Sequence, residues 1–198
     1  MTLPSATYAE RVALLLDRLT QLVRELQFCD GLNPAQWEAL RYVAQANRYS
    51  RTPTALAKFL GLTKGTVSQT IIALENKGYV RRDLSILDRR QLFLTLTDAG
   101  QALMARDPIS SLRQAAEQLI GEGDAEVVGG SLVKALSRLL HDLQLRHSLK
   151  EFGVCRECTL LCVAGQGGAA QTYNCGLTGD ALAESETAHI CVDFRATA

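Results

Sequence analysis

The sequence contains no hydrophobic run that approaches the length of a membrane span, and its N-terminus lacks the basic segment that begins a signal peptide. Glu10, Arg11 and Asp17 interrupt the apolar positions of that N-terminal stretch. From these absences we expect a cytoplasmic protein with no membrane partner. In that compartment thiols stay reduced, so a cluster of cysteines indicates metal or redox chemistry more often than disulfides.

Net charge is also absent, but only as an average over the chain, which carries 21 basic and 21 acidic side chains. Residues 41–90 contain ten Lys or Arg side chains against three acidic ones, a net charge of +7 that the remaining residues cancel. Such charge separation favours binding to a polyanion, with DNA or RNA as the leading candidate.

Motifs for catalysis are lacking as well. No GxSxG or similar nucleophile motif occurs, and no acid–base or nucleophile constellation stands out apart from the cysteines. We therefore expect that the protein is not an enzyme. An enzyme or electron carrier that uses this chain as a scaffold is the least favoured hypothesis.

Helical periodicity is present at both ends of the first 147 residues. Leucines recur at helical spacing in residues 5–29 and again in residues 125–146, and a helix interrupted at Pro108 is predicted after Thr97. These helices hold more apolar surface than the compact region of about 90 residues between them needs, so we expect a two-fold dimer built by interdigitating termini.

Between these ends lie two short helices joined by a glycine turn. Asn33-Pro34 begins a preceding helix, residues 52–60 form the first short helix, Gly61 ends it, and Thr63 caps the second, which runs to about Lys77. Val67, Ile71 and Leu74 form its buried seam. Its polar residues gather in the first two turns and are Lys64, Thr66, Ser68, Gln69 and Thr70. This arrangement is typical of a helix-turn-helix whose second helix enters the major groove.

A basic hairpin is predicted after the second helix. Tyr79–Arg82 and Gln91–Leu96 have the composition and alternation of strands, and the connection between them carries Asp88, Arg89 and Arg90. Such a wing can place its arginines along phosphates or in a minor groove.

These segments resemble the MarR family of bacterial transcription regulators. LNPAQWEALRYV is similar to the family's second helix, LAKFLGLTKGTVSQTIIALENKGYVRR to its helix-turn-helix, and DRRQLFLTLTDAG to its wing and fifth helix, within roughly residues 8–147. The resemblance implies a homodimeric winged helix that binds pseudo-palindromic double-stranded DNA operators, usually as a repressor relieved by a small molecule or by oxidation. It also implies that Asp88 and Arg90 organise the wing, that Arg89 or Arg90 reaches DNA, and that Lys64, Thr66, Ser68 and Gln69 face bases and phosphates.

Two positions depart from the family pattern. Many members carry Arg where Gln69 stands, and Gln pairs most naturally with adenine, so we expect a different target sequence. Gly65 stands where many members have Ser; it weakens the helix by about 1 kcal/mol but lets the backbone approach a phosphate.

The cysteines are concentrated in a tail that lies beyond the family pattern. Five of the six cysteines fall within residues 155–191, and the first 154 residues hold only Cys29. Cys155 and Cys158 have the spacing that brings two sulfurs to one metal, and Cys175 and Cys191 follow after gaps of sixteen and fifteen residues. We predict these four as the ligands of a metal centre, with Cys162 in reserve. A tail with few large apolar side chains needs such a staple, a docking surface, or both.

The identity of the metal stays open between two alternatives. Structural zinc sites usually take two paired knuckles, whereas this tail has one pair and two isolated cysteines, a pattern that an iron–sulfur cluster tolerates. An iron–sulfur cluster is therefore the first expectation, zinc the alternative, and metal-free redox thiols a third option.

The expected fold is mainly α with a small β-hairpin wing, a winged helix-turn-helix dimerised through its N- and C-terminal helices, plus a small cysteine-rich C-terminal extension. We divide the chain into residues 1–148, with the DNA-binding part at about 33–97, and a metal-binding tail at 149–198. The favoured hypothesis is a regulator, usually a repressor, whose iron–sulfur cluster senses iron or redox state. The alternative is a repressor that answers a small organic ligand and holds a structural zinc in its tail.

Overall fold

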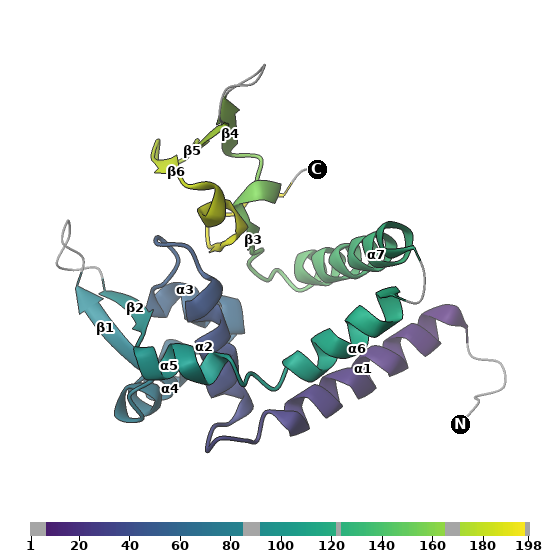
Figure 1. Ribbon diagram of the computed structural model, residues 1–198, viewed down its shortest axis with the longest axis horizontal. Helices are drawn as coiled ribbons and strands as arrows, with labels where there is room; N and C mark the ends of the chain where they lie inside the picture. The colour runs from purple at the N-terminus through teal and green to yellow at the C-terminus, as the bar shows by residue number, and fades with distance from the viewer. Residues whose placement is uncertain (1–6, 85–91, 122–123, 165–170, 197–198) are drawn as a thin grey trace.

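The computed structural model describes residues 7–84, 92–121, 124–164 and 171–196. It has three parts, which Figure 1 shows as a winged body, a helical arm and a C-terminal tail. The helices are α1 (Tyr8–Leu26), α2 (Pro34–Gln45), α3 (Pro53–Leu60), α4 (Lys64–Asn76), α5 (Asp98–Met104), α6 (Ser110–Gly121) and α7 (Ala125–Arg146). The strands are β1 (Val80–Leu84), β2 (Leu92–Leu96), β3 (Gly153–Val154), β4 (Leu161–Ala164), β5 (Thr172–Cys175), β6 (Ala181–Leu182) and β7 (Ile190–Cys191). Two 3-10 turns, η1 (Cys155–Glu157) and η2 (Glu184–Ala188), complete the tail.

Side-chain caps define where the helices of the winged body begin. The side-chain oxygen of Asn33 accepts from the backbone N–H of Gln36 at 3.0 Å, and the Gln36 side chain accepts from the backbone N–H of Asn33 at 3.2 Å. Thr52, Thr63 and Thr97 cap α3, α4 and α5 by accepting from the backbone N–H three residues further on. These bonds satisfy amide groups that would otherwise lack a partner at each helix start. The predicted helix starts at Asn33-Pro34, at residue 52, at Thr63 and after Thr97 are thereby confirmed.

One hydrophobic core holds the winged body together. It lies between α2, α3, α4, α5 and the hairpin, and its largest fully buried apolar side chains are Trp37, Tyr42, Leu40, Leu56, Ile71, Leu74, Leu94, Leu103 and Val67. The predicted seam of α4 is part of this core, so α4 turns its remaining sides outward.

The turn and the hairpin have the predicted geometry. Gly61 adopts a left-handed conformation with φ of 64°, which glycine reaches without the steric cost of a Cβ, and this ends α3. β1 and β2 pair antiparallel, with Val80 opposite Leu96 and Leu84 opposite Leu92. Asp88, Arg89 and Arg90 lie outside the described residues, so the hairpin is seen without its tip.

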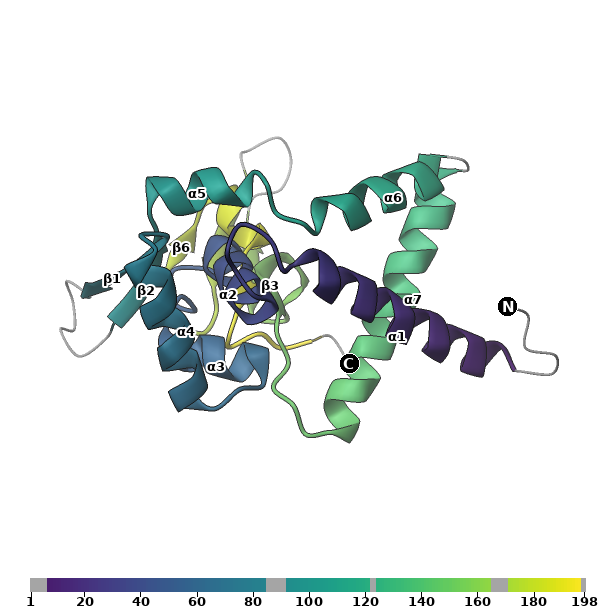
Figure 2. The ribbon, with the colours of Figure 1, turned by 90° about the horizontal axis from the view of Figure 1, so that it is seen from below.

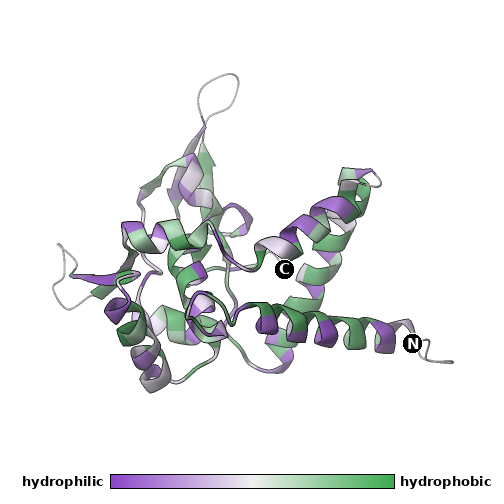
Figure 3. Cartoon of the chain, turned by 60° about the horizontal axis from the view of Figure 1, so that its bottom comes forward, coloured by the Kyte–Doolittle hydropathy of each residue, from purple (hydrophilic) through white to green (hydrophobic). Residues whose placement is uncertain are grey.

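The helical arm consists of α1, α6 and α7 and extends to one side of the winged body (Figure 2). Within the described part of the chain, α1 and α6 bury no residue, and α7 buries Gly129. Apolar positions (green in Figure 3) run along all three helices. Exposed leucines include Leu15, Leu19, Leu22, Leu119, Leu136, Leu140 and Leu143. The arm therefore presents apolar faces that its own subunit leaves uncovered. Of the helices that the structure describes, none is long and apolar enough to span a membrane.

The tail folds into two small sheets and lies on the winged body next to α2 and α3 (Figure 1). β3 pairs with β7, and β4, β5 and β6 form a three-stranded antiparallel sheet. Buried residues of the tail are few and include Cys155 and Thr187. Phe152, at the start of the tail, packs edge-on against Phe59 with ring centroids 5.1 Å apart. The tail is thus anchored by docking rather than by a core of its own.

Candidate functional site

Two surfaces bring the predicted site residues together, and the first is the exposed side of α4. Lys64, Thr66, Ser68 and Gln69 are all exposed, whereas Val67 between them is 1% exposed and points into the core. The Thr63 hydroxyl accepts from the backbone N–H of Thr66 at 3.2 Å, which fixes the first turn of the helix. Four polar side chains therefore stand on a rigid helix whose N-terminal end faces outward.

Thr70 is a correction to the predicted surface. Its residue is 9% exposed, and its hydroxyl donates to the backbone carbonyl of Thr66 at 3.1 Å. The hydroxyl is therefore already bonded within the helix and the side chain lies toward the core. Thr70 is removed from the contact surface because the helical rotation places it beside the Val67–Ile71–Leu74 seam rather than beside Ser68 and Gln69.

A shallow depression joins α4 to α3 and the hairpin. Its lining includes Lys64, Ser68 and Arg82, together with Pro53 and Thr54 at the start of α3. Arg82 pairs with Glu75 at 3.1 Å, while Arg81 pairs with Asp83 at 3.1 Å. These ion pairs hold the two arginines at the base of the hairpin. Arg89 and Arg90, predicted for the connection, lie outside the described residues.

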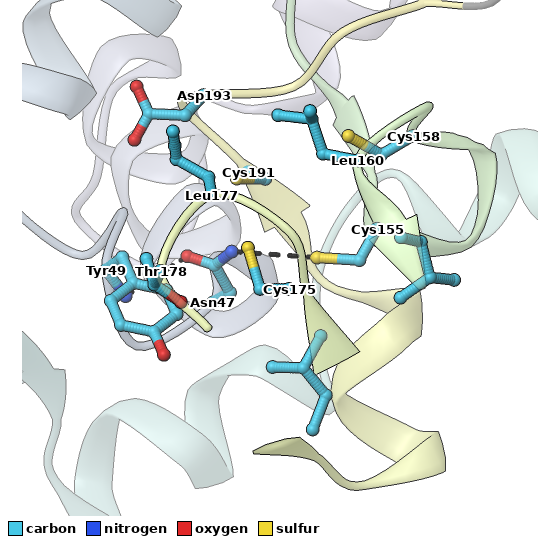
Figure 4. Close-up of a pocket in the computed structure, with 12 residues that line it drawn as sticks. Asn47, Tyr49, Cys155, Cys158, Leu160, Cys175, Leu177, Thr178, Cys191 and Asp193 are labelled. Carbon is cyan, nitrogen blue, oxygen red and sulfur yellow. Dashed lines mark hydrogen bonds between the residues drawn. The ribbon is translucent and has the colours of Figure 1, made fainter. Parts of the chain in front are cut away.

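The second surface is a small cavity between the tail and the connection from α2 to α3. Four cysteines line it, namely Cys155, Cys158, Cys175 and Cys191, and Asn47, Tyr49 and Asp193 lie among them. Figure 4 shows the amide of Asn47 reaching from the winged body toward the sulfur of Cys155. Cysteines that span 37 positions of the tail thus line one cavity.

Separate backbone turns place three of these sulfurs. Cys155 lies in η1, and the backbone N–H of Cys158 donates to the Cys155 carbonyl at 3.0 Å, which closes the turn of the close pair. Cys175 ends β5, and its backbone N–H donates to the backbone carbonyl of Asp180 at 2.9 Å. Gly176 follows, and a Cβ there would lie 2.8 Å from the carbonyl oxygen of Leu160, so glycine allows the two turns to approach.

The fourth sulfur, that of Cys191 in β7, interacts with the thiol of Cys155. The Cys155 thiol donates to the Cys191 sulfur, which lowers the pKa of Cys191 to about 6, and the backbone N–H of Asp193 and the side chain of Asn47 act in the same direction. The same hydrogen bond raises the pKa of Cys155, and burial adds to that effect. This hydrogen bond therefore favours the thiolate form of Cys191, which is the form that ligates metals.

Cys162, held in reserve by the sequence, lies on β4 outside this cavity. Its residue is exposed, and its sulfur is 3.9 Å from the carbonyl oxygen of Leu160. Cys162 pairs with Asn174 across the β4–β5 sheet, whereas Cys175 pairs with Leu161, so strand alternation directs Cys162 and Cys175 to opposite faces of the sheet. The structure thus separates Cys162 from the four cysteines that the sequence singled out.

The donor set around the cavity fits a thiolate metal centre in chemistry, although not in arrangement as it stands. Within the part of the chain that the structure describes, no group of three or more His, Cys, Asp or Glu side chains is arranged to hold a metal ion. The cavity nevertheless offers four sulfurs and an apolar surround that includes Leu160, Leu177 and Leu182. Thiolates suit zinc and iron–sulfur clusters, and a dry surround strengthens their interaction with a cation.

Sequence reasoning missed the segment Asn47–Ser50, which holds the tail. The Arg48 guanidinium donates to the carbonyl of Ala181 at 2.8 Å and lies 3.7 Å from Glu186, and the Tyr49 hydroxyl donates to Asp180. The only local signal is a short polar run between two helices, which by itself indicates a turn.

The comparisons agree with the winged body. Residues 30–91 match the MarR family, a narrower span than the resemblance over roughly residues 8–147. A putative transcriptional regulatory protein for the hcr operon of Thauera aromatica is 29% identical over 119 residues, which cover 60% of this chain and 69% of that protein.

Solved structures share the fold over 70% of the chain. A variant of S. aureus MepR is 22% identical and covers 70% of this chain and 100% of its own, with a TM-score of 0.55. A complex of S. aureus MepR with DNA is also 22% identical, over 70% and 97%, with a TM-score of 0.54. A variant of MarR from E. coli is 21% identical, over 70% and 99%, with a TM-score of 0.51. The segment that carries the helix-turn-helix and most of the wing therefore matches the MarR family, within a winged-helix fold shared with MarR and MepR.

Proposed function

We propose that this protein is a sequence-specific DNA-binding transcription regulator, acting as a repressor on a pseudo-palindromic operator. The observation that carries the proposal is the exposed polar surface of α4, where Lys64, Thr66, Ser68 and Gln69 stand on a helix fixed by its buried seam. Lys64 supplies charge for phosphates, and Gln69 supplies the paired donor and acceptor that recognise adenine in the major groove. The match of residues 30–91 and the fold shared with a DNA-bound MepR support the same function.

The working unit is a homodimer formed through the helical arm. The uncovered leucine faces of α1, α6 and α7 support this, because apolar surface of that extent is stable in water when a second copy covers it. A two-fold dimer presents two copies of α4, one to each half of a palindromic operator.

The four cysteines at the cavity hold a metal centre that stabilises the tail. An iron–sulfur cluster that reports iron or redox state is the first candidate, and a structural zinc in a regulator that answers an organic ligand is the second. Support comes from the gathering of Cys155, Cys158, Cys175 and Cys191 at one place while Cys162 stays outside it. Loss of the metal would release the tail from the winged body, and a released tail changes the constraint on α2 and α3.

DNA recognition is tested by selecting genomic fragments that the full-length protein retains and by measuring binding with and without competitor DNA. Gln69→Ala should cost about 1–3 kcal/mol on the selected operator and relax the preference at one base pair, while binding to random DNA stays unchanged. Equal loss on operator and random DNA would show that Gln69 does not read a base, and retention of no fragment above background would reject the regulator.

The metal centre is tested on protein purified without oxygen, by its ultraviolet–visible spectrum and by assays of iron, sulfide and zinc on the same sample. Absorption near 400 nm with iron and sulfide present identifies a cluster. A colourless protein with one zinc per chain identifies the second candidate. Protein that has neither, and takes up neither when supplied, would reject the metal centre and leave the DNA-binding proposal standing.

A further inference from the structure

The tail is fastened to the winged body on both sides of Cys191. The backbone N–H of Asn47 donates to the carbonyl of Ile190 at 2.8 Å, and the backbone N–H of Val192 donates to the hydroxyl of Ser50 at 2.8 Å. Ala46 and Ile190 also form a parallel β-bridge. The segment that bears this cysteine is therefore an extension of the α2–α3 connection, held by backbone bonds rather than by loose surface contacts.

The side-chain amide of Asn47 contacts the sulfur of Cys155 with its nitrogen and the Asn47–Ser50 turn with its oxygen. Its Nδ2 donates to the Sγ of Cys155 at 3.8 Å, and its Oδ1 accepts from the backbone N–H groups of Tyr49 at 3.1 Å and Ser50 at 2.9 Å. The residue is 6% exposed, so water cannot easily replace any of these bonds. A change in the position of the Cys155 sulfur therefore acts directly on the turn.

That turn is in contact with the elements that read DNA. The Ser50 carbonyl accepts from the backbone N–H of Thr52, the cap of α3, at 2.7 Å and from the Tyr42 hydroxyl at 2.7 Å. The next carbonyl, that of Arg51, accepts from the backbone N–H of Leu94 in β2 at 2.7 Å. The turn thus connects the cysteine cavity to the first helix of the helix-turn-helix and to the wing.

We infer that Asn47 is the positioning residue that completes the metal centre and connects it to the DNA-binding elements, an inference that rests on the proposed metal centre. Its N–H donates to the metal-bound thiolate of Cys155, and its carbonyl holds the turn that sets the start of α3. Four thiolates around one centre carry excess negative charge in a partly buried place, and a neutral N–H donor stabilises that charge without adding to it. The centre is therefore shared between the tail and the winged body.

The test replaces the N–H donor and keeps an acceptor for the turn. Asn47→Asp retains an oxygen for the Tyr49 and Ser50 N–H groups but puts a carboxylate beside the sulfurs, and Asn47→Ser retains a shorter acceptor without charge. Asn33→Asp is the matched control, because it makes the same chemical change at a helix cap where Asp serves as well as Asn. Full-length apoprotein is titrated with Co²⁺, followed by the thiolate-to-cobalt absorption, and with Zn²⁺ in competition with a chromophoric chelator.

Both Asn47 variants should lose about 10- to 100-fold in Zn²⁺ affinity and show altered thiolate-to-cobalt bands, while Asn33→Asp behaves like the wild type. A residue that only shapes the turn would leave the Asp variant with wild-type affinity and bands, and that result overturns the inference while the metal centre stands. Wild-type protein that shows no thiolate-to-cobalt absorption and holds no iron, sulfide or zinc after purification without oxygen overturns the metal centre itself, and the role of Asn47 with it.

The connection to DNA has its own readout on the selected operator. In the wild type, the dissociation constant should differ by about 5- to 150-fold between Zn²⁺-loaded and stripped protein, and the Asn47 variants at saturating Zn²⁺ should reduce that ratio to about twofold or less. An unchanged ratio in variants that have weakened metal binding would show that the centre acts on DNA by another route, and would overturn the connecting role.

Discussion

Single residues decide which thiols can act together. Cys155, Cys158, Cys175 and Cys191 meet because η1, the end of β5 and β7 each direct one or two of them to the same cavity, whereas strand alternation turns Cys162 outward. Which cysteines line the cavity therefore depends more on the backbone element that carries each one than on their spacing in the sequence. Cys158 and Cys162 are close in the chain and lie in different surroundings.

Removing one ligand separates these two kinds of cysteine. Cys175→Ser should abolish metal retention in purified protein, because a hydroxyl is a poor substitute for a thiolate toward zinc or iron. Cys162→Ser removes a thiol from the same sheet and should leave the metal content of the protein unchanged. The measurement is metal per chain by elemental analysis after gel filtration, and a loss of metal in Cys162→Ser with retention in Cys175→Ser would reverse the assignment.

At the scale of elements, the proposed DNA-binding surface consists of helix α4 and the β1–β2 hairpin, and we expect different contributions from the two. α4 has a fixed orientation because its seam is buried, and in the proposed function its exposed residues discriminate between bases. The hairpin carries arginines at the base, Arg81 and Arg82, and further arginines beyond the described strands. Its contribution is expected to be electrostatic and nearly independent of sequence.

This division predicts the effect of a wing substitution. Arg89→Ala should weaken binding to operator and random DNA by similar factors and lower the slope of log affinity against log salt by about 1, because one phosphate contact is lost. Arg113→Ala on α6 removes the same charge from an exposed position away from the hairpin and serves as the control. Binding measured by fluorescence anisotropy over a salt series decides the matter, and an unaltered slope for Arg89→Ala would exclude a phosphate contact by the wing.

At the scale of the whole molecule, the arm and the tail differ in whether their own subunit covers them. The tail packs on its own subunit, through the ring contact of Phe152 with Phe59 and through hydrogen bonds to the Asn47–Ser50 segment. The arm leaves its leucine faces open, and the proposed second copy would cover them. Under the proposed function, the cysteine cavity lies beside the DNA-binding elements and the dimer contact lies away from them.

A charge placed in the proposed dimer contact tests this arrangement. Leu136, which is 43% exposed in the single chain, lies among the apolar residues of α7. Leu136→Glu should raise the dimer dissociation constant by about 100-fold or more, because two buried carboxylates without partners cost several kcal/mol. Ser131→Glu adds the same charge to the exposed opposite side of α7. Sedimentation velocity over a concentration range compares the two, and dimers of equal strength would place the contact elsewhere.

The sequence by itself determined the local structure of this protein. Caps at Asn33, Thr52, Thr63 and Thr97, the glycine turn at Gly61 and the apolar spacing of α4 all depend on residues a few positions apart, and each is found as predicted. The grouping of the four cysteines could also be proposed, because the close pair and the isolated members are visible as a pattern. The sequence grouped Thr70 with the exposed polar residues of α4, whereas it is buried. Its exposure depends on its angular position around the helix, which residue spacing alone determines poorly.

Only the tertiary structure decided where the tail lies and what it touches. Asn47 and Cys155 are 108 positions apart, and Ser50 and Val192 are 142 positions apart, so no periodicity or spacing links them. Their contact follows from the close packing of a tail without its own core onto a turn that offers unpaired backbone groups and polar side chains. The sequence therefore specifies the helix-turn-helix and the cysteines locally, and long-range docking places the cysteines beside the α2–α3 connection.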